Sequence, residues 1–372
     1  MIRVLHVLGG LERGGAETMV MNLYRKIDKS EIQFDFIVHT ETKDAYYEEI
    51  ISLGGKIYHC PKYKGKNHFA YKKWWKTFFQ SHPEYRIVHG HVRSTASIYL
   101  KIARSEGLYA IAHSHSTSSG TGLSAFIKNC FQYRIRYNAD FYMGCSYEAN
   151  CWLFGKKVAK DATKCIVFKN AINTEIFRFS PEIRKKIRDQ LQVSTDCLLI
   201  GSVGRLTIPK NPTFIVQICK CIYELNLKAK KYSSVKMIWL GTGKLYDEII
   251  SLIKEESLSD VIELLGSRSD VNEIMQAMDA FILPSLWEGL GIVAIEAQAA
   301  GLPTFCSDVI PCEVSVSELC SFLPLGDPNI WADRILNADL TRKDCSKEIV
   351  EAGYDIKSTV QWLSEFYKKI KN

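Results

Sequence analysis

The sequence predicts an α/β protein with two doubly wound parallel-sheet domains, and three observations lead to this prediction. Short β-branched runs alternate with Gly-rich or polar loops and helical stretches, a pattern typical of parallel α/β layers. This series occurs twice, on either side of a polar, turn-prone segment at Asn170–Phe179. The 372 residues are too many for one ordinary domain. We therefore expect one domain over residues 1–172 and a second over residues 173–355.

In the first domain, each expected strand is a short run rich in β-branched or aromatic residues. The strands are expected at Ile2–Leu8, Phe34–His39, Lys56–His59, Ile87–His89, Ala110–His113, Phe141–Cys145 and Cys165–Phe168. Helices are expected at Ala16–Ile27 and Ala96–Ser105.

The same pattern continues in the second domain. The strands are expected at Leu198–Val203, Val235–Leu240, Val261–Leu264, Ala280–Leu283 and Thr304–Ser307. Helices are expected at Glu182–Leu191, Pro212–Tyr223, Leu245–Glu255, Val271–Met278 and Ile292–Ala300. A last helix over Ile356–Lys371 follows from apolar residues at helical spacing.

Composition excludes several classes of protein. Apolar residues make up 47% and charged residues 24% of the chain, which is ordinary globular usage. No apolar run approaches the ~20 residues of a membrane span. The net charge of +7 is too modest to indicate nucleic-acid binding. Because the N-terminus enters a strand without signal-peptide features, we expect a cytoplasmic protein with reduced cysteines. The cysteine spacing predicts no structural metal, since no second Cys or His pair accompanies Cys219 and Cys221.

The segment Lys62–His82 combines lysines with aromatic residues. As a helix, it would present an aromatic face beside a lysine cluster, which is typical of a segment in a membrane interface. The expected membrane contacts are Lys72, Lys73, Trp74, Trp75 and Lys76. The alternative is an ordinary amphipathic helix packed on its own sheet.

The stretch Ser285–Pro303 is the strongest local signal for a binding site. A strand ends at Pro284, a loop contains Glu288, Gly289 and Gly291, and a helix follows. The free N–H groups of a first helical turn bind anions, and a carboxylate such as Glu296 suits a sugar or ribose diol. Alternatively, Glu288 caps the helix and Glu296 is a solvated helix residue.

The stretch Gly201–Pro212 also leads from a strand through a Gly-containing loop into a helix, with Asn211 as the expected N-cap. It places Arg205 and Lys210 at the carboxyl end of a strand, where open α/β sheets bind ligands. An arginine and a lysine together suit a diphosphate, although both could be ordinary surface cations.

The loop Gly9–Glu17 joins a strand to a helix, and its Gly14 and Gly15 suit close backbone approach at the helix start. It lacks the Gly-x-Gly-x-x-Gly dinucleotide pattern. Ala16 and Glu17 stand where a P-loop requires Lys-Ser/Thr, so a P-loop ATPase is rejected.

Histidine pairs follow two strands of the first domain, His89-Gly-His91 and His113-Ser-His115. Two such pairs raise the possibility of a metal site, but no carboxylate accompanies them locally. A strand-end histidine is commonly structural; at His113-Ser-His115, a substrate contact is the competing interpretation.

Taken together, these stretches resemble the GT-B glycosyltransferases of family 4, which build capsular, exopolysaccharide and lipopolysaccharide sugars. The resemblance runs in the family's order over nearly the whole chain, and Glu288-x7-Glu296 with its Gly-Leu-Gly is its most specific part. The residues that carry it are Gly14–Glu17, His113-Ser-His115, Asn170–Asn173 with Phe177, Gly204-Arg205, Lys210-Asn211, Gly241-Thr-Gly243 and Glu288–Glu296.

The resemblance implies two Rossmann-like domains facing across a cleft, with helix 356–372 crossing back onto the first. The first domain would bind the acceptor and the second a nucleotide-sugar, with UDP preferred on family frequency. Glu288 would contact the donor sugar, Glu296 the ribose diol, and Arg205 with Lys210 the leaving diphosphate, so that no metal or other cofactor is needed. His115, or less readily His113, would lie near the reacting sugar. The remaining donor-binding residues would be Gly14, Gly15, Gly241, Gly243, Gly289, Leu290 and Gly291.

The implied activity is retaining, metal-independent transfer of a hexosyl group to a lipid-linked or saccharide acceptor at the inner face of the cytoplasmic membrane. Two alternatives remain open. A GT-B-like sugar-nucleotide epimerase would isomerise its donor without any acceptor. A non-catalytic scaffold would have a decayed site, against which the joint presence of Arg205, Lys210, Glu288 and Glu296 speaks.

Overall fold

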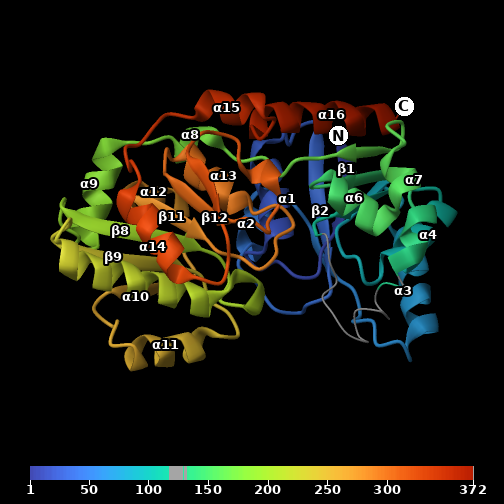
Figure 1. Ribbon diagram of the computed structural model, residues 1–372. Coiled ribbons are helices and arrows are strands. Elements are labelled where there is room, and N and C mark those ends of the chain that lie inside the picture. Colours follow the sequence, from blue (N-terminus) through green and yellow to red (C-terminus); the bar gives the residue numbers. More distant parts are fainter. Residues whose placement is uncertain (117–128, 130–131, 372) are drawn as a thin grey trace. The chain divides into compact units, whose positions relative to one another are not determined.

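The computed structural model describes residues 1–116, 129 and 132–371 (Figure 1). The chain divides into two compact units. Unit 1 comprises Met1–Ile172 together with the segment from Gly353 to the C-terminus, and unit 2 comprises Asn173–Ala352. Each unit contains one sheet in which all pairings are parallel, so the predicted fold class of two doubly wound α/β domains is confirmed.

Unit 1 contains a seven-stranded sheet in the order β3-β2-β1-β4-β5-β6-β7. Its strands are β1 (Ile2–Val7), β2 (Ile32–Val38), β3 (Ile57–His59), β4 (Ile87–Gly90), β5 (Tyr109–Ser114), β6 (Phe141–Gly144) and β7 (Cys165–Val167). Its helices include α1 (Gly15–Lys26), α2 (Tyr47–Ser52), α3 (His68–Ser81), α4 (Ala96–Ser105), η1 (Tyr133–Tyr137), α6 (Tyr147–Phe154), α7 (Lys156–Ala159) and α16 (Ile356–Lys371). The order reverses at β1 and β4, whose carboxyl ends therefore form the switch point where open α/β sheets bind ligands.

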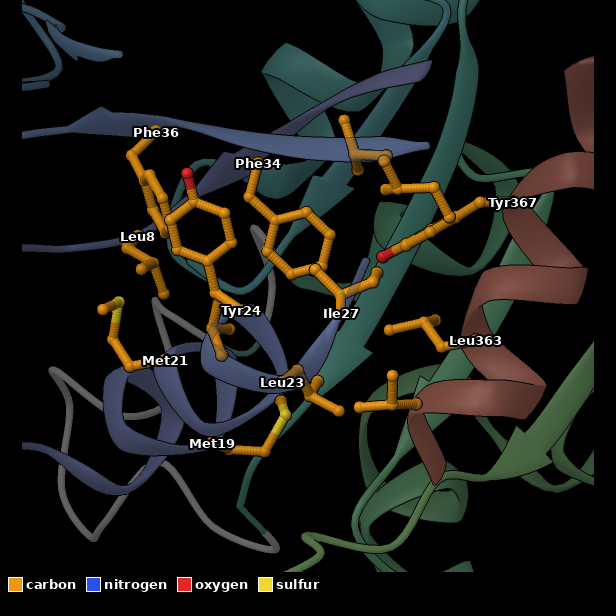
Figure 2. Close-up of a cluster of buried hydrophobic side chains, with 14 of the residues drawn as sticks. Leu8, Met19, Met21, Leu23, Tyr24, Ile27, Phe34, Phe36, Leu363 and Tyr367 are labelled. Carbon is orange, nitrogen blue, oxygen red and sulfur yellow. The ribbon is translucent and has the colours of Figure 1, made fainter. Parts of the chain in front are cut away.

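Helix α16 belongs to unit 1 although it ends the chain. Its Leu363 and Tyr367 are fully buried in one core with Tyr24 of α1 and Phe34 of β2 (Figure 2). A parallel bridge between Ile172 and Asp355 joins the segment before α16 to the end of the first part of unit 1. Residues 353–355, which we expected to close the second domain, are therefore paired with unit 1.

Helix α3 corrects one expectation about the membrane. Trp75 is 0% exposed and stacks on Tyr99 in the core of unit 1, with a ring separation of 5.0 Å. The prediction that Trp75 contacts a membrane is therefore wrong, because its helical position points it toward the sheet. Trp74 is half-buried, whereas Lys72, Lys73 and Lys76 are exposed.

Unit 2 contains a six-stranded sheet in the order β10-β9-β8-β11-β12-β13, with helices on both faces (Figure 1). Its strands are β8 (Cys197–Val203), β9 (Ser234–Leu240), β10 (Ile262–Gly266), β11 (Ala280–Leu283), β12 (Thr304–Ser307) and β13 (Cys320–Leu323). Its helices are α8 (Thr174–Phe177), α9 (Pro181–Gln190), η2 (Ile208–Lys210), α10 (Pro212–Ala229), α11 (Tyr246–Glu255), α12 (Val271–Ala277), α13 (Ile292–Ala299), η3 (Cys312–Val314), α14 (Pro328–Asn337) and α15 (Ser346–Glu351). Here the order reverses at β8 and β11, so the loops after these two strands occupy the corresponding switch point.

Among the described residues, no helix is both long and apolar enough to span a membrane.

Candidate functional site

Hydrogen bonds tie together the loops that follow β8, β9 and β11 at the carboxyl edge of the unit 2 sheet. The N–H of Leu286 donates to the carbonyl of Pro209 over 2.8 Å, and the N–H of Leu206 donates to the carbonyl of Thr242 over 3.0 Å. Asn211 is the residue before α10, as predicted, but its side chain donates to the carbonyl of Pro284 rather than capping the helix. These bonds hold the two predicted stretches against each other.

Lys210 and Glu288 form an ion pair within this edge. Lys210 Nζ lies 2.5 Å from Glu288 Oε1, and the hydroxyl of Ser285 donates to the same oxygen over 2.7 Å. Both charged side chains are mostly shielded from solvent, with 20% and 11% of their surface exposed. Glu288 does not cap α13, whose N-cap is Gly291, so that alternative is wrong. The pair places a cation and its counter-charge at the carboxyl ends of the strands, where an anionic ligand could compete with Glu288 for Lys210.

Arg205 differs from Lys210 in being exposed. Within the described part of the chain, its guanidinium has no ion pair or side-chain hydrogen-bond partner. An unpaired guanidinium at the switch point is available for a bidentate contact with an oxyanion.

Helix α13 begins with a backbone turn that favours glycine. Gly291 has φ +91° and ψ 46°, in the left-handed region that other residues adopt only at a cost. Gly289 is half-buried and Leu290 is buried, so the predicted donor contact of Leu290 stays a prediction. The first turn of α13 therefore offers backbone N–H groups with the positive end of the helix dipole.

Glu296 lies on α13 and is half-buried. Burial raises the pKa of its carboxyl to about 8, so the group is largely protonated at neutral pH. The described residues provide no hydrogen-bond partner for it. The carboxyl therefore has its hydrogen-bonding capacity available for a polar ligand. The alternative of a fully solvated helix residue is wrong.

Gly241 and Gly243 serve the packing of these loops. A Cβ on Gly241 would collide with the carbonyl of Gly204, and one on Gly243 would collide with the carbonyl of Leu206. The loop that contains Gly204 and Arg205 is also bonded to Trp239, whose indole N–H donates to the carbonyl of Gly204 over 2.9 Å. These glycines position the Arg205 loop, and their contact with a donor stays a prediction.

In unit 1, α1 starts at Gly15 with Gly14 as its N-cap. Gly15 is exposed, and a Cβ there would meet nothing within 4 Å. A Cβ on Gly14 would instead collide with the carboxyl of Glu17. Backbone approach at this helix start is therefore open at Gly15.

The strand-end histidines of unit 1 form a larger cluster than the sequence indicated. His91 Nδ1 lies 2.8 Å from His115 Nε2, and His91 Nε2 lies 3.0 Å from Nδ1 of His6. In the same cluster, His89 Nε2 lies 3.1 Å from His113 Nδ1. His89 Nδ1 lies 2.7 Å from the hydroxyl of Tyr367 in α16.

Burial keeps these imidazoles neutral. It lowers the pKa of His115 to about 3, with the positive charge of Arg93 adding to the effect. Burial likewise lowers the pKa of His6, His89, His91 and His113 well below the usual value, with neighbouring imidazoles contributing. His113 is buried and His115 is half-buried, so His115 is better placed to touch a ligand.

Sequence reasoning missed His6, Tyr367 and the position of Ser285 against Glu288. The register of β1 with β4 places His6 beside His89, and such cross-strand partners are not readable from one strand alone. The available signal was a histidine within each of three predicted strands, His6, His89 and His113.

Comparison with known proteins identifies relatives of this arrangement. Residues 183–320 match the family model described as "Glycosyl transferases group 1". The chain is 32% identical to the putative glycosyltransferase EpsF of Bacillus subtilis, over 98% of this chain and 96% of that protein. It is 28% identical to UDP-Gal:alpha-D-GlcNAc-diphosphoundecaprenol alpha-1,3-galactosyltransferase of Escherichia coli, over 76% of this chain and 75% of that protein. The crystal structure of Anabaena Alr3699/HepE in complex with UDP is similar in fold, with a TM-score of 0.76, 16% identity, and coverage of 99% of this chain and 100% of that one.

Proposed function

Because the chain belongs to the group 1 glycosyltransferases and has their GT-B type of fold, we propose that it transfers a sugar from a UDP-sugar to a lipid-linked or saccharide acceptor in surface polysaccharide biosynthesis. The galactosyltransferase among its relatives is named for a UDP-galactose donor and a diphosphoundecaprenol-linked acceptor, which supports both choices. We assign donor binding to unit 2 and acceptor binding to unit 1.

One observation supports the proposal more than any other. Arg205, Lys210, Glu288 and Glu296 all come from the loops and helix at the carboxyl edge of one sheet. This set combines two cations for a diphosphate with two carboxyl groups for hydroxyls. A scaffold with a decayed site would not need it.

The proposed reaction separates charge at the leaving group. The bond between the anomeric carbon and the diphosphate oxygen breaks, and the acceptor oxygen bonds to the same carbon on the same face, so the configuration is retained. The acceptor's proton passes to the departing phosphate oxygen. Arg205 and Lys210 stabilise the negative charge that develops on the diphosphate, which is the role a metal ion would otherwise take.

The phosphate groups of the donor are negatively charged and can replace Glu288 as the partner of Lys210. When a diphosphate binds, Lys210 Nζ moves from Glu288 to a phosphate oxygen, and Glu288 becomes available to accept hydrogen bonds from the sugar hydroxyls. Glu296 binds the ribose diol. We retain His115, with His113 as the alternative, as the unit 1 residue that contacts the transferred sugar.

We further propose that the protein works at the inner face of the cytoplasmic membrane through α3. Phe69, Lys72, Lys73 and Lys76 have the i, i+3, i+4, i+7 spacing of one helix face, and Phe69 is 85% exposed. An exposed aromatic ring among lysines suits an anionic lipid surface. Phe69→Ser with Lys72→Ala and Lys73→Ala should lower sedimentation with anionic liposomes, whereas Lys101→Ala on α4 should not. Equal sedimentation of both would contradict the proposal.

The transfer assay uses UDP-glucose, UDP-galactose and their N-acetyl forms with undecaprenyl-diphosphate-linked sugars. We expect a product only when donor and acceptor are both present. Isomerised donor without acceptor would replace the proposal with an epimerase. Neither product nor nucleotide binding would favour a scaffold.

A further inference from the structure

Five imidazole side chains meet at the carboxyl edge of the unit 1 sheet. His6 lies in β1, His89 in β4 and His113 in β5, while His91 and His115 follow β4 and β5 directly. Within the described residues, His6 Nε2, His113 Nε2 and His115 Nδ1 are buried ring nitrogens without a hydrogen-bond partner. Such atoms cost free energy unless something satisfies them, and an ion bound to His113 Nε2 would satisfy one of the three.

Two overlapping groups in this cluster have metal-ligand spacing. One is His6, His89 and His91; the other is His91, His113 and His115. In each group, one nitrogen from every ring lies within 4.8 Å of the others. The first group is wholly buried, whereas the half-buried His115 gives the second a route for an ion to enter.

We propose that His91, His113 and His115 bind a transition-metal ion of the zinc class through three imidazole nitrogens. Zinc bound at about 2.0–2.1 Å in a tetrahedron places its ligand nitrogens about 3.3 Å apart. His91 Nδ1 and His115 Nε2 lie 2.8 Å apart, so a small opening of this pair admits the ion. Three protein ligands leave a fourth position for an exogenous ligand, and an ion there would take the place of the direct contact between His115 and the sugar that is proposed above.

The surrounding hydrogen bonds suit this assignment. With His91 bound through Nδ1, its Nε2–H donates to His6 Nδ1 over 3.0 Å. With His113 bound through Nε2, its Nδ1–H donates to His89 Nε2 over 3.1 Å, and His89 Nδ1–H donates to the Tyr367 hydroxyl over 2.7 Å. Two of the three ligands thus donate their second N–H to a partner, the arrangement that orients metal-bound histidines.

The charges around the cluster select the kind of ion. Neutral imidazole is the form that binds a metal. The absence of a carboxylate among the three ligands disfavours magnesium and calcium.

The test uses full-length, tag-free protein stripped with a chelator and titrated with Co²⁺, and then with Zn²⁺ in competition. We expect the visible absorption of tetrahedral Co²⁺ at one equivalent. His115→Gln and His91→Gln should weaken binding by about 100-fold or more, and His6→Gln by about 10-fold as the loss of an outer partner. His82→Gln, in the same unit but outside the cluster, should change nothing.

Three results would overturn the proposal. They are no binding above a nonspecific background, equal effects of all four substitutions, or loss with His6→Gln while His115→Gln is silent. The last result would move the ion to the buried group. Should a variant fail to fold by near-ultraviolet circular dichroism, X-ray absorption of the zinc-loaded parent decides, since fewer than three imidazoles per zinc contradicts the assignment.

Discussion

The two units place different chemistry at the same position of similar sheets. The carboxyl edge of unit 2 has charged groups, with Arg205 exposed and Lys210 paired with Glu288. The carboxyl edge of unit 1 has neutral imidazoles, linked through His91 to both His6 and His115. The parallel topology therefore supplies a place for a ligand, and the loop residues decide which ligand it suits.

The largest expected effect comes from removing the Arg205 side chain at the carboxyl ends of the unit 2 strands. Arg205→Ala should lower the transfer rate by about 100- to 1,000-fold, because a positioned donor to a developing oxyanion contributes that much. The measurement is kcat with saturating donor and acceptor. Arg334→Ala, an exposed arginine on α14, is the matched control and should retain the parent rate. An equal loss of kcat in both variants would contradict a specific role for Arg205 in catalysis.

The next effect concerns the carboxyl of Glu296. The Glu296 carboxyl can bond both ribose hydroxyls, and each hydrogen bond contributes about 0.5–1.5 kcal/mol, so Glu296→Ala should weaken UDP binding by about 10- to 100-fold. Isothermal titration calorimetry measures this change. Glu365→Ala on α16 of unit 1 should bind UDP like the parent. If Glu296→Ala binds UDP with the parent's affinity, Glu296 does not contact the nucleotide.

The buried histidines of unit 1 should make the free energy of unfolding fall at acidic pH. The pKa of His115 is lowered from 6.5 to about 3, so the unfolded state binds more protons between these values and stability falls as pH drops below about 6.5. His115→Gln removes the part of this pH dependence that comes from His115. The Tm difference between pH 7 and pH 5 should therefore shrink by a few degrees. His82→Gln should keep the parent's pH profile. A profile that His115→Gln leaves unchanged would show that His115 titrates normally in the folded protein.

Glu296 should act with the opposite sign. Its pKa is raised from 4.5 to about 8, so the folded state holds a proton that the unfolded state has lost. Stability should therefore fall as pH rises through this window. Glu296→Gln should flatten the decline of Tm between pH 5 and pH 8, measured without ligand. A steeper decline would contradict the protonated carboxyl.

Local sequence signals predicted the strands near both switch points well, because each is a short β-branched run followed by a glycine loop. They predicted Asn211 at the start of α10 because asparagine followed by proline is typical of the start of a helix. The strand Cys320–Leu323 was not predicted, since its four residues form a strand only by pairing with β12. The burial of Trp75 was also missed, because spacing alone does not say which face of an amphipathic helix meets the sheet.

Contacts between residues that are distant in the sequence could not be predicted from it. Nothing near Lys210 indicates that it pairs with Glu288, which lies 78 residues away. His89 and Tyr367 are 278 residues apart and meet only because α16 belongs to unit 1. The types of residue at a site were thus readable from the sequence, and their partners were not.

The most direct test of the contrast is UDP binding to four full-length proteins: the parent, Arg205→Ala, Glu296→Ala and His115→Gln. Calorimetry at pH 7.5 gives each affinity under the same conditions. We predict that Arg205→Ala and Glu296→Ala weaken binding by about 10-fold or more, whereas His115→Gln binds like the parent. Weakening by His115→Gln alone, or no weakening in any variant, would contradict the assignment of the nucleotide to the charged edge of unit 2.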